Sequence, residues 1–116
     1  MVKIWFSWAE FGVIIEELVI KIQKSRCKFN GVYGIPRGGL SFAVTLSHKL
    51  KLPLLLYPTK NTLVCDDISD TGRTLASHKN KKIVTLFSTK RTKTKPDWHS
   101  KIKKSKEDWI VFPWEL

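Results

Sequence analysis

The chain has 116 residues, of which 42% are hydrophobic and 27% charged, and its formal net charge is +11. This composition excludes a disordered chain, and the length suits one domain with a real core, so we expect residues 1–116 to form a single domain. No apolar run approaches the roughly 20 residues that a membrane-spanning helix needs. The charge favours polyanionic partners, either nucleic acid or small phosphorylated molecules.

The cysteines and the amino terminus indicate the compartment. Cys27 and Cys65 are far apart and have no metal-ligand spacing, which favours reduced thiols. The apolar run at residues 2–6 is too short for a secretion signal. We therefore expect a cytoplasmic protein.

The first predicted element is an amphipathic helix that begins after Ser7. Glu10 follows Ser7 at the spacing of a capping box. Apolar residues then recur with helical periodicity to about Lys24: Phe11, Ile14, Ile15, Leu18, Val19 and Ile22.

A short strand at residues 31–35 and a helix at 40–50 are separated by the turn Pro36-Arg37-Gly38-Gly39. Glycines before a helix expose backbone N–H groups, and the Arg37 guanidinium is suited to phosphate oxygens. Such a turn is also typical of an ordinary structural connection. Its place in the chain decides between the two readings.

The most informative segment follows a predicted strand at 53–57, a tight turn at 58–61 and a strand at 62–65. Two adjacent carboxylates, Asp66 and Asp67, end this strand, and Asp70-Thr71-Gly72-Arg73-Thr74 then opens a short helix predicted at about 73–78. The carboxylates can accept hydrogen bonds from ribose hydroxyls, and the turn can wrap a phosphate with backbone amides at a helix N-terminus. The alternative is a strand-turn-helix in which these residues only cap the helix.

The remaining chain gives a strand at 82–87, a basic loop region at 88–106 and a final strand at 109–112. Strands that alternate with helices predict an α/β fold with a mostly parallel sheet covered on both faces. Ligands in such sheets bind at the carboxyl ends of strands, so both glycine-bearing turns could face one cleft. Between Lys79 and Lys106 the only acidic residue is Asp97. This basic run is either a solvated face or a field that attracts phosphorylated substrates.

Three ordered segments resemble the type I phosphoribosyltransferases. Residues 63–75 match the phosphoribosyl-diphosphate motif, and the turn at residues 36–39 is similar to the pyrophosphate loop. Residues 109–115 resemble the end of the xanthine-guanine branch, as does the segment at residues 7–10. The resemblance implies a single-domain, Rossmann-like phosphoribosyltransferase fold.

The resemblance also implies residue roles. Asp66 and Asp67 would hold the ribose hydroxyls directly or through Mg²⁺, and Asp70 would manage the proton at purine N7 as a bond forms at N9. Trp109 would stack on the purine, the Ile110 backbone would read its exocyclic groups, and Lys90, within a register of one residue, would bind the 6-oxo group. The phosphate-binding set is Arg37, Gly38 and Gly39 for pyrophosphate and Thr71, Gly72, Arg73 and Thr74 for the 5′-phosphate.

The chain departs from the family pattern in one place. Relatives carry a long mobile loop between the strands that correspond to residues 53–57 and 62–65, and this loop closes over the active site. Here only Pro58-Thr59-Lys60-Asn61 lies between them, so we expect the lid to be missing. Lys60 or the basic stretch at 90–95 is the candidate for a partial replacement.

Three functions remain open from the sequence. The leading one is a purine phosphoribosyltransferase of nucleotide salvage, which would use phosphoribosyl diphosphate, Mg²⁺ and guanine, xanthine or hypoxanthine, as a homodimer or homotetramer. The second is a regulatory module that binds phosphoribosyl diphosphate or a nucleotide without efficient catalysis. The third, less favoured, is a nucleic-acid-binding protein that uses the basic face.

Overall fold

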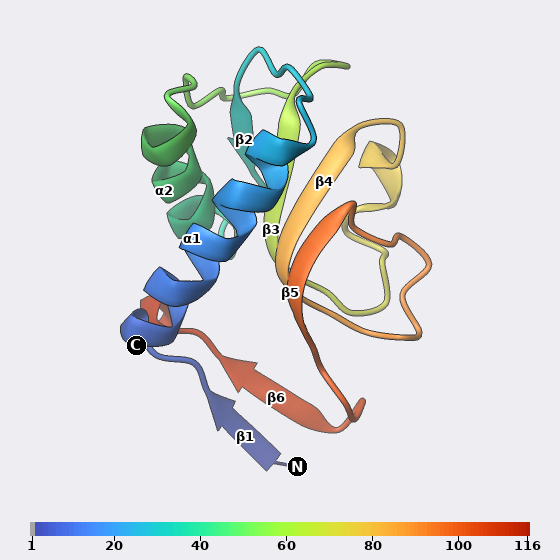
Figure 1. Cartoon of the computed structure of the whole chain (residues 1–116). Helices are drawn as coiled ribbons and strands as arrows, with labels where there is room; N and C mark the ends of the chain where they lie inside the picture. The colour runs from blue at the N-terminus through green and yellow to red at the C-terminus, as the bar shows by residue number, and fades with distance from the viewer. Residues whose placement is uncertain (1) are drawn as a thin grey trace.

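The computed structural model describes residues 2–116 as a parallel sheet with two helices on one face and a small two-stranded sheet beneath them (Figure 1). The central sheet has the order β2-β3-β4-β5, with β2 at Val32–Gly34, β3 at Leu63–Ser69, β4 at Lys82–Ser88 and β5 at Trp98–Ile102. All three strand pairs are parallel. The predicted α/β class with a mostly parallel sheet is confirmed.

The long helices cover one face of this sheet (Figure 1). Helix α1, Trp8–Lys24, begins at the predicted capping box, in which Ser7 Oγ accepts a hydrogen bond from the Glu10 N–H at 3.1 Å and Glu10 Oε1 accepts one from the Ser7 N–H. The six apolar residues predicted for its inner face are all buried. Helix α2, Leu40–Leu50, buries Phe42, Ala43 and Leu46 against β2 and β3. These contacts form the main hydrophobic core.

The opposite face of the sheet is covered by irregular chain. Leu75 packs there on Val64 of β3 and Ile83 of β4. The helix predicted at 73–78 is reduced to a turn and a short 3₁₀ helix, η1, at Ala76–His78. Gly72 has φ +86°, so the chain leaves β3 through a left-handed turn, which helical backbone cannot continue.

Two strands form a separate small sheet below the helices (Figure 1). Strand β1, Val2–Trp5, pairs in parallel with β6, Asp108–Val111. The chain ends in a second 3₁₀ helix, η2, at Pro113–Glu115. The sequence reading predicted β6 near its observed position but assigned no strand at β1.

The segment predicted as a strand at 53–57 is almost unpaired. It makes one parallel bridge, between Leu54 and Val32, while Leu56 and Tyr57 are 83% and 81% exposed. Pro53 and Pro58 flank it and donate no backbone hydrogen bonds, which limits the ladder to one bridge. Conversely, β5 lies inside the region predicted as a basic loop. Among residues 2–116, no helix is both long and apolar enough to span a bilayer.

Candidate active site

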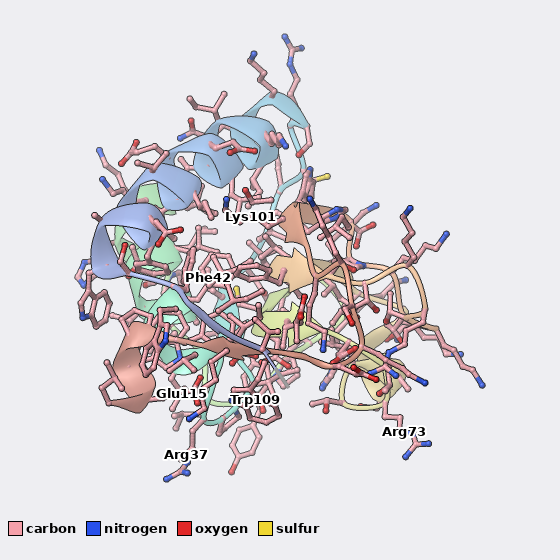
Figure 2. The ribbon with its side chains drawn as sticks, turned by 90° about the horizontal axis from the view of Figure 1, so that it is seen from below. Arg37, Phe42, Arg73, Lys101, Trp109 and Glu115 are labelled. Carbon is pink, nitrogen blue, oxygen red and sulfur yellow. The ribbon has the colours of Figure 1, made fainter. Side chains whose placement is uncertain are left out.

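A cavity of about 760 Å³ lies at the carboxyl ends of the central strands. Its walls come from the turn after β2, the end of β3, the segment after β5 and the chain from β6 to η2. The lining residues that matter below are Arg37, Gly38, Asp67, Asp70, Lys103, Trp109 and Ile110. Figure 2, which views this end, shows Arg37, Trp109 and Glu115 grouped together and Arg73 at the far margin.

A smaller hollow of about 180 Å³ adjoins the cavity and is formed by residues 66–75. Asp67, Ile68 and Asp70 line both spaces. A Cβ on Gly72 would lie 2.5 Å from the Thr94 backbone nitrogen, so only glycine fits between this loop and the crossover at 89–97. The Thr94 hydroxyl donates to the Gly72 carbonyl at 2.7 Å, which fixes the loop. The backbone amides and the exposed hydroxyls of Thr71 and Thr74 could bind an anion. The helix dipole expected from the sequence is absent, because no α-helix follows this loop.

Asp66 and Asp67 lie within β3, which continues to Ser69 and so extends beyond the strand end predicted at residue 65. Both carboxylates are in a poorly solvated position. Burial raises the pKa of Asp66 to about 8, and the neighbouring charge of Asp67 adds to the effect. Burial also raises the pKa of Asp67, although hydrogen bonds from Asp66 and from the Ile68 N–H oppose the shift. A bound cation or hydrogen bonds from ribose hydroxyls would offset the repulsion between these two carboxylates and their loss of solvation.

Asp70 is clamped between two cations. Lys103 Nζ donates to its Oδ2 at 2.7 Å, and Arg91 donates to its Oδ1 through Nε at 2.9 Å and Nη2 at 2.7 Å. Partial burial alone would raise the pKa of Asp70, but these hydrogen bonds and charges lower it below 3.8. Asp70 is therefore a fixed negative charge at neutral pH.

The turn after β2 packs tightly beneath Asp67. A side chain on Gly38 would overlap the Asp67 carboxylate, with a Cβ 2.8 Å from its Cγ. A side chain on Gly39 would come within 2.5 Å of the Cys65 carbonyl oxygen. The two glycines thus bring the backbone against the acidic pair, while Arg37 is exposed at the mouth of the cavity.

The far wall of the cavity is aromatic and carries one buried cation. Trp109 is 55% exposed, whereas Trp114 packs among Trp8, Phe11 and Phe112 at the edge of the core. Ile110 is buried beside them. Lys103 is only 8% exposed and also lines the cavity.

The structure brings most of the predicted residues together, with two exceptions. Lys90 is exposed and does not line the cavity; it borders a neighbouring hollow with Lys103, Lys104 and Lys106. Lys60 lies at the other end of the sheet, because Asn61 and Thr59 are hydrogen-bonded to Asn30 before β2. Lys60 therefore cannot take the place of a lid over this cavity.

Sequence reasoning missed Lys103. Within the basic run at 88–106 a buried lysine looks the same as its solvated neighbours, and its partner Asp70 is 33 residues away. The only signal in the sequence was Asp70 itself, because an acidic residue in a loop that binds phosphate needs a cationic partner.

Within residues 2–116 no three His, Cys, Asp or Glu side chains gather into a metal cluster. The donor set at Asp66 and Asp67 nevertheless fits Mg²⁺, because this ion is commonly held by one or two carboxylates together with substrate phosphates.

No protein-family model and no curated protein matches the sequence. Among solved structures, a purine phosphoribosyltransferase from Pyrococcus horikoshii Ot3 superposes with a TM-score of 0.84 at 29% identity, over 100% of this chain and 95% of that one. A xanthine-guanine-hypoxanthine phosphoribosyltransferase from Helicobacter pylori gives 0.80 at 24% identity, over 98% and 94%. A hypothetical protein from Neisseria gonorrhoeae with bound ppGpp shares the fold at 0.77 and 18% identity, over 99% and 90%. The chain thus has the type I phosphoribosyltransferase fold, and along its whole length it resembles the purine branch of that family.

Proposed function

We propose that this protein transfers the 5-phosphoribosyl group from phosphoribosyl diphosphate to a 6-oxopurine and releases pyrophosphate. The observation that carries the proposal is the joined pair of hollows at the carboxyl ends of β2, β3 and β5. Asp67 and Asp70 line both, with an amide-rich loop on one side and Trp109 on the other. This arrangement follows the order phosphate, sugar, base of a nucleotide. The similarity to purine phosphoribosyltransferases supports the same reading.

The sugar phosphate would occupy the smaller hollow. Backbone amides of residues 70–74 and the hydroxyls of Thr71 and Thr74 would bind the 5′-phosphate. The carboxylates of Asp66 and Asp67 would accept hydrogen bonds from the ribose hydroxyls.

Pyrophosphate would lie in the larger cavity, where Arg37, Gly38 and Asp67 line one wall. The Gly38 and Gly39 backbone allows its close approach, and the Arg37 guanidinium would pair with its oxygens. Asp66 and Asp67 would hold Mg²⁺ through water or substrate. This ion would neutralise the charge that develops on the leaving group.

The purine would stack on Trp109, with the Ile110 backbone against its exocyclic groups. We assign the 6-oxo contact to Lys103 and not to Lys90, because only Lys103 lines the cavity. Its ammonium has three donors, so it can serve both Asp70 and the purine oxygen. A permanent donor there favours a 6-oxo over a 6-amino purine.

In the reaction, the bond from ribose C1 to the pyrophosphate oxygen breaks and its electron pair leaves with pyrophosphate, while purine N9 bonds to C1. The sugar passes through a state with oxocarbenium character. Asp70 would accept a hydrogen bond from N7–H and stabilise the positive charge that develops on the purine. The N7 proton would then pass to solvent water, which leaves the neutral base in the nucleotide. The lowered pKa of Asp70 makes it a charge-stabilising group and a weak proton acceptor.

The test is incubation with phosphoribosyl diphosphate, Mg²⁺ and either guanine, hypoxanthine, xanthine or adenine, followed by chromatography of the products. We expect a nucleotide from at least one 6-oxopurine and much less from adenine, because the Lys103 ammonium would face an amino group. Formation of a nucleotide from adenine alone would contradict the assignment of the base site.

One observation favours a second candidate, a regulatory module that binds phosphoribosyl diphosphate without efficient turnover. The turn at 58–61, where relatives carry a lid, lies at the opposite end of the sheet, so no segment of residues 51–62 reaches the cavity. Tight binding in calorimetry, with no nucleotide formed from any base, would favour this candidate.

We also propose that the protein assembles as a homodimer or homotetramer. Large apolar side chains are exposed on β1 and α1, namely Val2, Trp5, Trp8, Val13 and Ile20. Light scattering would test this, and a monomeric mass at micromolar concentration would contradict it.

A further inference from the structure

A second large cavity lies at the end of the central sheet opposite the active site. It has a volume of about 530 Å³ and is bordered by the residues that precede β2, β3 and β5 and by the start of β4. The amino ends of all four central strands therefore meet around it. We call this hollow the amino-end cleft.

Seven lysines from separate parts of the chain line the amino-end cleft. Lys28 and Lys60 precede β2 and β3. Lys79, Lys81 and Lys82 come from the turn into β4, and Lys93 and Lys95 come from the crossover into β5. Asp97 is the one acidic residue of the lining, and it is already occupied by Lys82 at 3.6 Å and by the Ile83 N–H at 2.8 Å.

Little of this positive charge is neutralised by acidic side chains within the described residues. Lys82 is the one lysine of the lining that forms an ion pair there. Ammonium groups brought together without acidic partners repel one another and attract polyanions. The proposed transfer reaction uses none of these residues, because its cavity lies at the other end of the strands.

We propose that the amino-end cleft binds the phosphodiester backbone of single-stranded nucleic acid. The lining contains lysines and asparagines but neither the arginine fork nor the glycine loop that typically encloses a small phosphate. Flexible point charges on several segments are suited to a chain of separated phosphates. Half-buried Phe29 provides an aromatic surface for a base, as in sites that bind single strands without sequence preference.

The positive charge also continues beyond the cleft. The crossover that supplies Lys93 and Lys95 begins with Lys90 and Arg91, which border another hollow together with Lys104 and Lys106. A strand several nucleotides long could follow this band from the cleft along the crossover toward the carboxyl end of β5. A small polyphosphate would use only part of it.

The test is fluorescence anisotropy with a labelled 15-nucleotide single-stranded RNA, titrated at several salt concentrations. The variant Lys79→Gln/Lys81→Gln/Lys95→Gln removes three charges from the cleft. The control Lys49→Gln/Lys51→Gln/Lys101→Gln removes the same charge from positions that line neither basic hollow. If three phosphate contacts are lost, the slope of log K against log salt should fall by about 2, and affinity at 0.1 M salt should fall by more than about tenfold.

The control variant should bind RNA nearly as well as wild type, and Asp67→Asn should bind it unchanged. The cleft variant should retain its nucleotide-forming activity, which separates this proposal from the transfer reaction. Equal loss of RNA binding in the cleft and control variants would overturn the proposal, because net charge alone would then explain binding. Tight binding of tripolyphosphate by a protein that does not bind RNA would overturn it as well.

Discussion

The two ends of the central sheet have opposite kinds of electrostatics. At the carboxyl ends, Asp66 and Lys103 are buried, and Asp70 is held by Lys103 and Arg91. At the amino ends, seven lysines surround a hollow with one acid among them. Burial makes the first end sensitive to single atoms and to pH, whereas exposure makes the second sensitive to total charge and to salt. In a parallel sheet all strands have their carboxyl ends at one edge and their amino ends at the opposite edge, so the two kinds of charge are kept apart.

The largest expected effect is loss of transfer in Asp67→Asn. Asp67 lines both hollows of the active site and carries no ion pair, so its removal should abolish sugar binding and lower kcat/KM by on the order of a hundredfold or more. Its melting temperature should stay near that of wild type. Kinetics and thermal melts of this variant, beside the exposed control Glu107→Gln, make the measurement. A collapse of the melting temperature would show that the carboxylate is structural.

The buried acid beside it should make stability depend on pH. Asp66 is 6% exposed with a pKa of about 8, against 3.8 for the ordinary group. Below pH 4 both folded and unfolded states hold the proton, so its stabilising contribution is fully present there. Between about pH 4 and pH 8 only the unfolded state releases the proton, so stability falls as pH rises.

Urea unfolding across this range should therefore show wild type losing on the order of a few kcal/mol relative to Asp66→Asn, which does not titrate. Parallel curves for the two proteins would contradict the assigned environment of Asp66.

A contrast between two lysines tests the base site. Lys103→Met should lower kcat/KM for a 6-oxopurine about tenfold to a hundredfold, because a charged hydrogen bond contributes about 1.5–3 kcal/mol. Lys90→Met should change it less than about twofold, since Lys90 lies outside the cavity. Steady-state kinetics with saturating phosphoribosyl diphosphate would distinguish them. A larger loss in Lys90→Met would return the role to the position expected from the sequence.

The smallest expected effects on transfer come from Arg91→Ala at the active site and Lys60→Ala at the amino-end cleft. Arg91→Ala removes one of the two cations on Asp70 and should lower transfer by only a few-fold, because the pair is exposed and Lys103 remains. Lys60→Ala should leave transfer unchanged and weaken RNA binding instead. Loss of transfer in Lys60→Ala would mean that the amino-end cleft is coupled to the active site.

The sequence predicted the parts of the fold and the site that depend on local patterns. The capping box at Ser7 and the apolar periodicity of α1 are local, and so is the acidic strand end with its glycine turn. Strand β1 could not be found this way, because all four of its residues are exposed and its partner begins at Asp108. Strand β5 is polar and is defined by its pairing with β4.

The same reasoning explains why Lys103 was not predicted as a residue of the cavity. Lys90 lies two residues after the end of β4, where the family pattern places the base-recognising lysine, but burial and the contact with Asp70 belong to Lys103. Long-range packing decides which lysine of a basic run is buried. A single sequence carries no signal of that choice.

We expect the open cavity, without a lid, to direct the ribosyl group to a purine. The decisive measurement is pyrophosphate release from phosphoribosyl diphosphate with and without a 6-oxopurine, together with the amount of nucleotide formed. We predict that the base accelerates release and that nucleotide accounts for most of it, with a smaller base-independent fraction from attack by water. Release that is unaffected by any purine, or no release from folded protein, would contradict the account.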